Sequence, residues 1–187
     1  MPGSLPALFD WPPEPVLARA ARIRILALDV DGVLTDGTVW YGPAGETLKP
    51  FSILDGLGLR LLLRAGIHVA IITARSSEPL HARMHDLGLE MVYSGVDDKL
   101  QTWERVLQEL ALEPGAAAYM GDDLIDLPVL RRAGLALTVP NGHPALRCAA
   151  HWCSRRSGGQ GAVREACELI LAGHGRLADV LAEYGHE

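Results

Sequence analysis

The 187-residue sequence predicts an α/β fold in which a doubly wound parallel sheet carries helices on both faces. Short apolar runs alternate along the chain with segments of helical periodicity, which is the pattern of right-handed βαβ crossovers. Clusters of polar residues follow several of these runs directly. In an open parallel sheet this position is the edge at which ligands bind.

The composition is that of an ordinary globular chain, with 49% hydrophobic and 21% charged residues in a length that suits one domain. The net charge of −6 argues against a nucleic-acid partner. No apolar run approaches membrane-spanning length and the first residues do not resemble a signal peptide, so we expect no membrane partner and a cytoplasmic protein. The cysteines lack zinc-site spacing and fit a reducing compartment.

The elements are predicted from apolar runs and helical periods. Residues 1–20 are expected to form a Pro-rich arm, extended over its first fifteen or so residues, ahead of a single domain over 21–187. The predicted strands lie at 23–28, 68–72, 91–93, 117–120 and 135–138. The predicted helices lie at 56–64, 78–87, 100–110, 124–132, 162–171 and 176–184.

A β-hairpin is predicted between the first strand and the first helix of the sheet. Residues 38–41 and 46–49 flank the sequence Gly42-Pro43-Ala44-Gly45, which is typical of a short hairpin loop. We expect the hairpin to project near the C-terminal end of the first strand. Trp40 and Tyr41 on it would either pack in a small cluster or contact another subunit.

Four polar clusters follow predicted strands: Asp29-Val30-Asp31-Gly32, Thr73-Ala74-Arg75, Asp97-Asp98-Lys99 and Gly121-Asp122-Asp123-Leu124-Ile125-Asp126. Carboxylates crowded at one edge repel one another and require a cation. Because Mg²⁺ prefers a few carboxylates together with water and phosphate oxygens, we expect it to be bound by Asp29, Asp122 and the backbone carbonyl of Asp31. Asp126 is expected to orient Lys99 or the waters of the ion.

The four clusters, in this order, resemble the motifs of the haloacid-dehalogenase-like (HAD) phosphotransferases. Over about residues 23–173 the chain is similar to the 3-deoxy-D-manno-octulosonate 8-phosphate phosphatase family within that superfamily. The similarity rests on DVDGVLTDG, GETLKPF, SILDGLGLR, IITAR, GDDLIDLPV and GGQGAVREACELI. One departure is Ala74, where that family usually has Gly, which changes how closely the backbone can approach phosphate.

The resemblance implies an Mg²⁺-dependent phosphomonoesterase of lipopolysaccharide precursor synthesis that acts on this eight-carbon sugar phosphate through an aspartyl-phosphate. It implies that Asp29 is the nucleophile and that Asp31 is the general acid and then the general base. Thr73 would bind the phosphoryl group, and Lys99 would neutralise its charge. The residues implied to support the metal site are Asp123 and Asp126.

Substrate recognition is also carried over from the resemblance. The implied residues are Asp31, Ser52, Ile53, Leu54, Asp55, Gly56, Arg60, Arg75, Arg83 and Lys99. An Arg can bind the carboxylate of an acidic sugar through two parallel hydrogen bonds. Arg is also the common base of this chain, so a solvated helix face is the alternative explanation for any one of the three arginines, although we favour substrate binding.

The hairpin, one helix and one strand fill the interval between Asp36 and Thr73, so no cap domain fits there. We therefore expect neighbouring subunits to cover the site in a homotetramer like that of the resembled family, through the hairpin and the Gly-rich segment 157–161. That segment could also hold an anion at the start of the last long helix, or simply form a turn.

Two other functions stay open. One is a phosphatase for a nine-carbon ulosonate 9-phosphate, against which the GGQGAVRE segment argues without excluding it. The other is a non-catalytic phospho-receiver-like module. The phosphorylated Asp of a receiver is expected at the end of a middle strand, whereas Asp29 follows the first strand of the chain.

Overall fold

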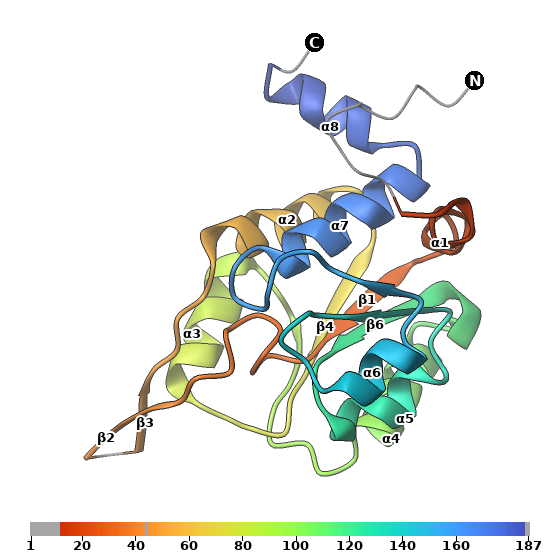
Figure 1. Cartoon of the computed structure of the whole chain (residues 1–187). Helices are drawn as coiled ribbons and strands as arrows, with labels where there is room; N and C mark the ends of the chain where they lie inside the picture. Colours follow the sequence, from red (N-terminus) through yellow and green to blue (C-terminus); the bar gives the residue numbers. More distant parts are fainter. Residues whose placement is uncertain (1–11, 44, 186–187) are drawn as a thin grey trace.

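The computed structural model describes residues 12–43 and 45–185. Its centre is a six-stranded parallel sheet with the strand order β5-β4-β1-β6-β7-β8 (Figure 1). The strands are β1 (Ile25–Leu28), β4 (His68–Ile72), β5 (Met91–Tyr93), β6 (Ala117–Gly121), β7 (Leu135–Thr138) and β8 (Trp152–Cys153). The predicted doubly wound α/β fold class is confirmed.

Helices cover both faces of the sheet. They are α1 (Glu14–Ala20), α2 (Ile53–Arg64), α3 (Glu78–Leu87), α4 (Lys99–Glu109), α5 (Leu127–Leu130), α6 (Pro144–Ala149), α7 (Ala162–Gly173) and α8 (Leu177–Glu183), with 3₁₀ turns η1 (Pro114–Ala116) and η2 (Leu124–Asp126). In the described part of the chain, none of them combines the length and the apolar composition that crossing a membrane requires.

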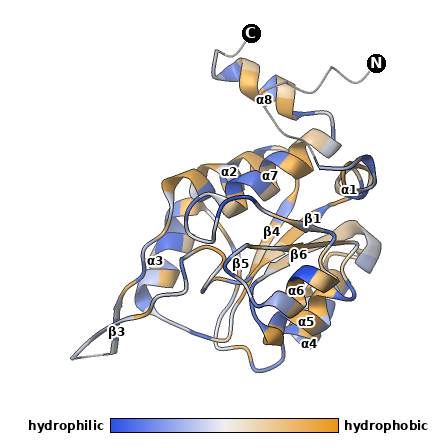
Figure 2. Cartoon of the chain, viewed as in Figure 1, coloured by the Kyte–Doolittle hydropathy of each residue, from blue (hydrophilic) through white to orange (hydrophobic). Residues whose placement is uncertain are grey.

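Two hydrophobic clusters, one on each face of the sheet, form the core. Leu26 and Leu28 of β1 belong to the cluster under α1, α2 and α7, and Ile25 and Ala27 belong to the cluster under α4 and α5. This division follows from the two-residue period of a strand, which points successive side chains to opposite faces. The covering helices show hydrophobic and hydrophilic residues side by side, as amphipathic helices do (Figure 2).

The expectation that the N-terminal arm is extended up to about residue 15 is wrong at its end, because residues 14–20 of the arm are helical. These residues form α1, which buries Val16 and Ala20 in the same cluster as α7. Pro15 lies in the first turn of the helix, where the missing N–H of a proline removes no helical hydrogen bond. Residues 1–11 of the expected arm lie outside the described residues.

The remaining predicted elements differ from the structure mainly at their ends. The predicted helix 124–132 is divided into η2 and α5, and α6 and β8 were not predicted. Both missed elements are short, and β8 is a two-residue strand at the edge of the sheet, so neither gives a clear periodic pattern.

The predicted hairpin is present as a separate two-stranded antiparallel sheet, β2 (Trp40–Gly42) and β3 (Gly45–Leu48), and it projects from the body of the molecule (Figure 1). β1 lies between β4 and β6, in the middle of the main sheet. Asp29 therefore follows a middle strand in space. The position of its strand does not separate a phosphatase from a receiver module, contrary to the sequence-based expectation.

The Gly-rich segment 157–161 packs on the loop that follows β1. A Cβ at Gly158 would overlap the backbone oxygen of Gly32. Asn141 joins the same two segments, since its Nδ2 donates to the Gly32 oxygen (3.0 Å) and its Oδ1 accepts from the Gly158 N–H (2.8 Å). The N–H of Gly159 donates to the oxygen of Val33 at 3.0 Å. The glycines therefore allow two backbone segments to approach closely.

The same contacts contradict an anion-binding role for this segment. Besides Gly158 and Gly159, the N–H of Gln160 donates to the oxygen of Ser157, and the N–H of Gly161 donates to Asp55. Backbone donors that already have partners inside the chain are not free to bind an anion. The segment is a turn, which is the second of the two readings of its sequence.

Gly158→Ala is expected to lower the free energy of unfolding by roughly 1–3 kcal/mol, because the added methyl group would overlap backbone and force it to shift. Gly115→Ala is the matched control, since a Cβ there would meet no described atom within 4 Å. Urea denaturation of both variants measures the difference. Equal stability of the two variants would contradict the close packing at Gly158.

Candidate active site

The ends of β1, β4 and β6 and the start of α4 bring the four predicted clusters together. They surround a cavity of about 280 Å³ whose lining includes Asp29, Asp31, Thr73, Arg75, Lys99, Asp122 and Asp123. β1 pairs in parallel with both β4 and β6, so the carboxyl ends of these three strands meet at one edge. The parallel sheet thus explains why residues distant in the sequence meet here.

Asp29 and Lys99 form a buried ion pair at the centre of this cavity. The Nζ of Lys99 lies 3.0 Å from Oδ1 of Asp29 and 2.7 Å from Oδ1 of Asp126. Burial, with the charge of Asp126, raises the pKa of Asp29 to about 6 although Lys99 opposes the shift. Burial alone would lower the pKa of Lys99, but the two carboxylates outweigh it and raise that pKa above its ordinary value. The ammonium group therefore stays charged.

Asp126 organises the surrounding groups. Its Oδ1 accepts hydrogen bonds from Lys99 and from the hydroxyl of Tyr119 (both 2.7 Å), and its Oδ2 accepts from the backbone N–H groups of Asp122 and Asp123 (3.1 and 3.2 Å). These bonds use most of the acceptor capacity of a carboxylate. Asp126 is thus suited to orienting Lys99, as expected from the sequence. Tyr119 was missed because it reads as an apolar residue of a buried strand.

Asp122 has a carboxylate oxygen that accepts no hydrogen bond within the described part of the chain. Its Oδ1 is buried and has no hydrogen-bond partner among the described residues. Burial and the charges of Asp29 and Asp126 raise the pKa of Asp122 to about 8. Gly32 is required beside it, because a Cβ at that position would overlap the carboxylate of Asp122.

A divalent metal ion fits this donor set. Oxygen atoms of Asp29, Asp122 and Asp126 lie within 4.8 Å of one another, and carboxylate oxygens are preferred by Mg²⁺. Because Asp126 is already engaged by four donors, Asp29 and Asp122 are the carboxylates with capacity to bind the ion. The unpartnered oxygen of Asp122 and the raised pKa values of both groups fit carboxylates that bind a cation.

Two predicted residues have local roles that the motifs alone did not reveal. Asp123 is exposed and caps η2, where its side chain accepts from the N–H of Leu124 at 2.7 Å. It forms a capping box with Asp126, in which the side chain of each residue accepts from the backbone N–H of the other. Thr73 is buried at the end of β4, and its Oγ1 accepts from the N–H of Arg75 at 3.3 Å.

Asp55, which the resemblance implied as a substrate-binding residue, is not among the residues that line the cavity. Its side chain is buried, and its two oxygens accept from the backbone N–H groups of Gly161 (3.3 Å) and Arg164 (2.8 Å) at the start of α7. Burial raises the pKa of Asp55 although these hydrogen bonds oppose the shift. Asp55 therefore joins α2 to α7, which holds the Gly-rich segment in place.

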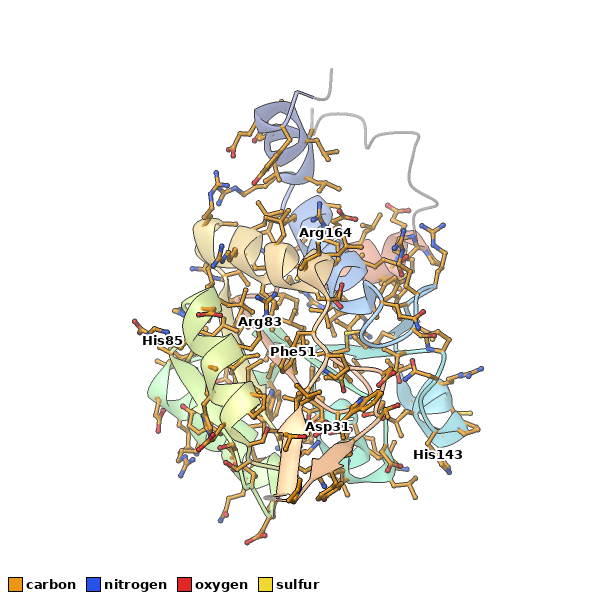
Figure 3. All side chains as sticks on the ribbon, turned by 90° about the vertical axis from the view of Figure 1, so that its left-hand side faces the viewer. Asp31, Phe51, Arg83, His85, His143 and Arg164 are labelled. Carbon is orange, nitrogen blue, oxygen red and sulfur yellow. The ribbon has the colours of Figure 1, made fainter. Side chains whose placement is uncertain are left out.

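Arg60 is also engaged elsewhere, since its guanidinium donates to the backbone oxygen of Asp86 near the C-terminal end of α3. Arg83 differs, because it lies across the N-terminal part of α2 at Gly56, where a Cβ would overlap its guanidinium. The Nε of Arg83 is buried and has no hydrogen-bond partner in the described part of the chain. Arg83 and Phe51 are labelled on the same face as Asp31 in Figure 3.

The exposed start of α2 contains the other residues expected to bind the sugar. Ser52 caps this helix by accepting from the N–H of Leu54 at 3.2 Å, and Ile53 and Leu54 are exposed. These residues are not among those that line the cavity. They could be reached only by a ligand that extends out of it.

Lys49 and Glu46, which join the hairpin to the loop after β1, were not among the site residues predicted from the sequence. Lys49 forms ion pairs with Asp31 and Glu46, and Arg75 forms ion pairs with the same two carboxylates. The available signals were that Lys49 is one of only two lysines in the chain and that it lies in the GETLKPF segment.

Without metal, the protein is expected to lose stability as pH rises from about 4 to about 8. The fold raises the pKa of Asp122 to about 8, so the native state favours its protonated form and is destabilised as that proton is lost. Since one pKa unit corresponds to about 1.4 kcal/mol, the loss amounts to a few kcal/mol. Urea denaturation in chelator at about pH 5 and pH 8 measures it.

Asp122→Asn should weaken this pH dependence and abolish stabilisation by Mg²⁺ at pH 8. Asp97→Asn, which replaces an exposed acid at the same sheet edge, is the control and should change neither. Stabilisation of the Asp122→Asn variant by Mg²⁺ to the wild-type extent would contradict the assignment of Asp122 to the metal site.

No protein-family model matches the chain. The chain is 46% identical over 164 residues to the 3-deoxy-D-manno-octulosonate 8-phosphate phosphatase KdsC of Yersinia pestis, covering 88% of each protein. It is similar to the solved structure of the Moraxella catarrhalis 3-deoxy-D-manno-octulosonate 8-phosphate phosphatase in complex with magnesium, phosphate and KDO (TM-score 0.88, 40% identity, 90% of this chain and 97% of that one).

A further similar structure is the cobalt-bound deoxy-D-mannose-octulosonate 8-phosphate phosphatase of Haemophilus influenzae (TM-score 0.83, 33% identity, 86% of this chain and 94% of that one). The identities and coverage confirm the resemblance found in the sequence. The chain belongs to the 3-deoxy-D-manno-octulosonate 8-phosphate phosphatase family of the HAD superfamily.

Proposed function

We propose that the protein is an Mg²⁺-dependent phosphomonoesterase that hydrolyses 3-deoxy-D-manno-octulosonate 8-phosphate to the free sugar acid and phosphate. The observation that carries this proposal is the buried Asp29–Lys99 pair beside the unpartnered carboxylate oxygen of Asp122. Relatives that carry this activity in their names support the substrate. The sugar acid produced places the reaction in lipopolysaccharide precursor synthesis.

Asp29, Asp122 and the backbone carbonyl of Asp31 would hold the Mg²⁺ ion. When bound, the ion supplies positive charge against the phosphoryl oxygens. Lys99 adds a second positive charge, fixed by Asp126, at the same place. Phosphoryl transfer depends mostly on positioning and charge neutralisation, which this small set of groups can provide.

In the first half-reaction a carboxylate oxygen of Asp29 attacks phosphorus. The bond between phosphorus and the sugar oxygen breaks, and its electron pair stays on that oxygen, which takes a proton from the carboxyl group of Asp31. The products are the free sugar acid and phosphorylated Asp29. Thr73, which follows the neighbouring strand β4, would hydrogen-bond a phosphoryl oxygen.

In the second half-reaction water attacks the phosphorus bound to Asp29. The carboxylate of Asp31 accepts a proton from that water, and the bond between phosphorus and Asp29 breaks with its electron pair returning to the carboxylate. Inorganic phosphate is released. Asp29 is again ionised and Asp31 again carries a proton, so both residues are ready for the next substrate.

Arg83 is our candidate for binding the carboxylate of the sugar acid. Its unpartnered Nε and its position against Gly56 put an unsatisfied guanidinium group beside the exposed start of α2. Arg75 lies inside the cavity, but its guanidinium is already paired with Glu46 and Asp31. Arg75 would therefore act next to the reacting groups, and Arg83 at the far end of the substrate.

We also propose a cytoplasmic location and a homotetramer. The three free cysteines, Cys148, Cys153 and Cys167, support a reducing compartment. Trp40, Tyr41 and Leu48 of the hairpin are 54%, 70% and 63% exposed, which supports burial of the hairpin against another subunit.

Phosphate release with Mg²⁺ from a panel of sugar phosphates tests the activity. We expect strong preference for the eight-carbon substrate over arabinose 5-phosphate and over a nine-carbon ulosonate 9-phosphate. Equal rates on the first two would contradict the proposed substrate. A preference for the nine-carbon compound would favour the alternative phosphatase left open by the sequence.

Asp29→Asn should lower kcat by more than about 10³-fold, because an amide cannot replace the attacking carboxylate. Circular dichroism should show an intact fold. Radiolabelled phosphate should be trapped on the wild-type protein in acid-quenched reactions and not on this variant. Activity of the variant close to that of the wild type would exclude Asp29 as the nucleophile.

Light scattering should give a mass of four times 20.1 kDa for the wild type. The double change Trp40→Ser and Leu48→Ser should shift the protein to smaller species by making the hairpin polar. Tyr184→Ser is the matched control, because Tyr184 is equally exposed but lies after α8, away from the hairpin. A fully active monomer would contradict the tetramer.

A further inference from the structure

Both lysines of the chain contact the aspartates to which we assign the chemistry. The chain has 15 arginines but only two lysines. Lys99 pairs with Asp29, and Lys49, which follows β3 of the hairpin, pairs with Asp31. The mechanism above uses Lys99 but gives no role to Lys49.

Lys49 belongs to a closed ring of alternating charges. Its ammonium group contacts Oδ1 of Asp31 and lies 2.9 Å from Oε1 of Glu46. Arg75 closes the ring, since its Nη2 lies 3.0 Å from Oε2 of Glu46 and its Nε lies 3.7 Å from Oδ2 of Asp31. Arg75 Nη2 also donates to the hydroxyl of Tyr41 at 3.2 Å. Three members of this network come from the hairpin.

The ring is largely shielded from solvent at Lys49 and Glu46, whose side chains are 2% and 8% exposed. Pairing with Lys49 and Arg75 keeps the pKa of Glu46 below its ordinary value, against the effect of its burial. A shielded ion pair is costly to break, because removal of one partner leaves a charge that water cannot reach easily. Lys49 is therefore a fixed contact of Asp31, unlike a mobile surface lysine.

We propose that Lys49 is a positioning residue that aims the carboxyl group of Asp31 for proton transfer; this inference rests on the proposed function. Lys49 holds Oδ1, whereas Oδ2 has no hydrogen-bond partner among the described residues and only the longer ion-pair contact with Arg75 Nε at 3.7 Å. The oxygen with unused capacity is the one that can exchange a proton with the leaving oxygen or with water. Glu46 fixes Lys49 from the other side.

This role predicts a dependence on the leaving group. The oxygen of a sugar leaves as a strongly basic alkoxide unless it is protonated, whereas p-nitrophenolate leaves without a proton. The value of kcat/KM covers only the steps up to transfer of the phosphoryl group to Asp29. Misdirection of Asp31 should therefore lower kcat/KM for a sugar phosphate and leave that for p-nitrophenyl phosphate nearly unchanged.

Lys49→Met is the test variant, because it keeps the length of the side chain and removes the charge. We expect its kcat/KM to fall by about 10²-fold or more for the eight-carbon sugar phosphate, the range of general acid catalysis, and by less than about 3-fold for p-nitrophenyl phosphate. Asp31→Asn should show the same selective loss. The double variant should be no worse than Asp31→Asn alone, because Lys49 acts through Asp31.

Lys49→Arg is the second variant in case Lys49→Met folds poorly by circular dichroism. It keeps the charge, but a planar guanidinium directs its donors differently, so a partial loss with the same selectivity is expected. Equal losses on both substrates would indicate a general disturbance of the site and would overturn the proposal. A loss confined to KM for the sugar phosphate, or additive losses in the double variant, would overturn it as well.

These outcomes are separable from failure of the proposed function. If the wild type does not hydrolyse the eight-carbon sugar phosphate, the substrate assignment is wrong. The role of Lys49 is then tested on arabinose 5-phosphate, which also has an alkoxide leaving group. If Lys49→Met lowers kcat/KM for arabinose 5-phosphate but not for p-nitrophenyl phosphate, the role of Lys49 is supported. Equal losses on these two substrates would refute it.

Discussion

The buried carboxylates at the C-terminal edge of the sheet set the main constraint on this structure. Asp29, Asp122 and Asp126 lie so close together that burial and mutual repulsion raise the pKa values of the first two. Lys99 compensates part of this charge. A divalent cation can balance the negative charge that remains. Without a bound cation, this arrangement therefore disfavours ionisation of Asp29 and Asp122. With a cation bound, their ionised forms are favoured.

Close backbone packing makes this crowding possible. Gly32 gives Asp122 room beside the loop after β1, and Gly158 brings a second backbone segment against the other side of that loop. Asn141 fastens the two segments, and Asp55 fixes the start of the helix that follows. The positions of the charged groups therefore depend on close backbone packing and hydrogen bonds, several of which involve the last third of the chain.

The residues at the sheet edge could be predicted because each motif follows a strand, and parallel strands bring their carboxyl ends together. The role of Asp55 could not be predicted, since an Asp in the first turn of a helix normally serves its own helix, whereas its partners start α7. The ion pair between Lys49 and Asp31 depends on how the hairpin folds back. Neither Lys49 nor Asp31 lies in a strand or helix periodicity from which the contact could be predicted.

The hairpin therefore presents charged side chains to the body of the molecule and apolar side chains to solvent. Glu46 and Lys49 face inward to Asp31 and Arg75, and Trp40 and Leu48 remain exposed. A two-stranded hairpin is marginally stable alone, so the ion-pair ring and any subunit that buries its apolar residues must stabilise it together. A partner that orders the hairpin would also order the contact with Asp31. Under the proposed tetramer and the proposed role of Asp31, assembly and proton transfer would thus be connected through four charged side chains.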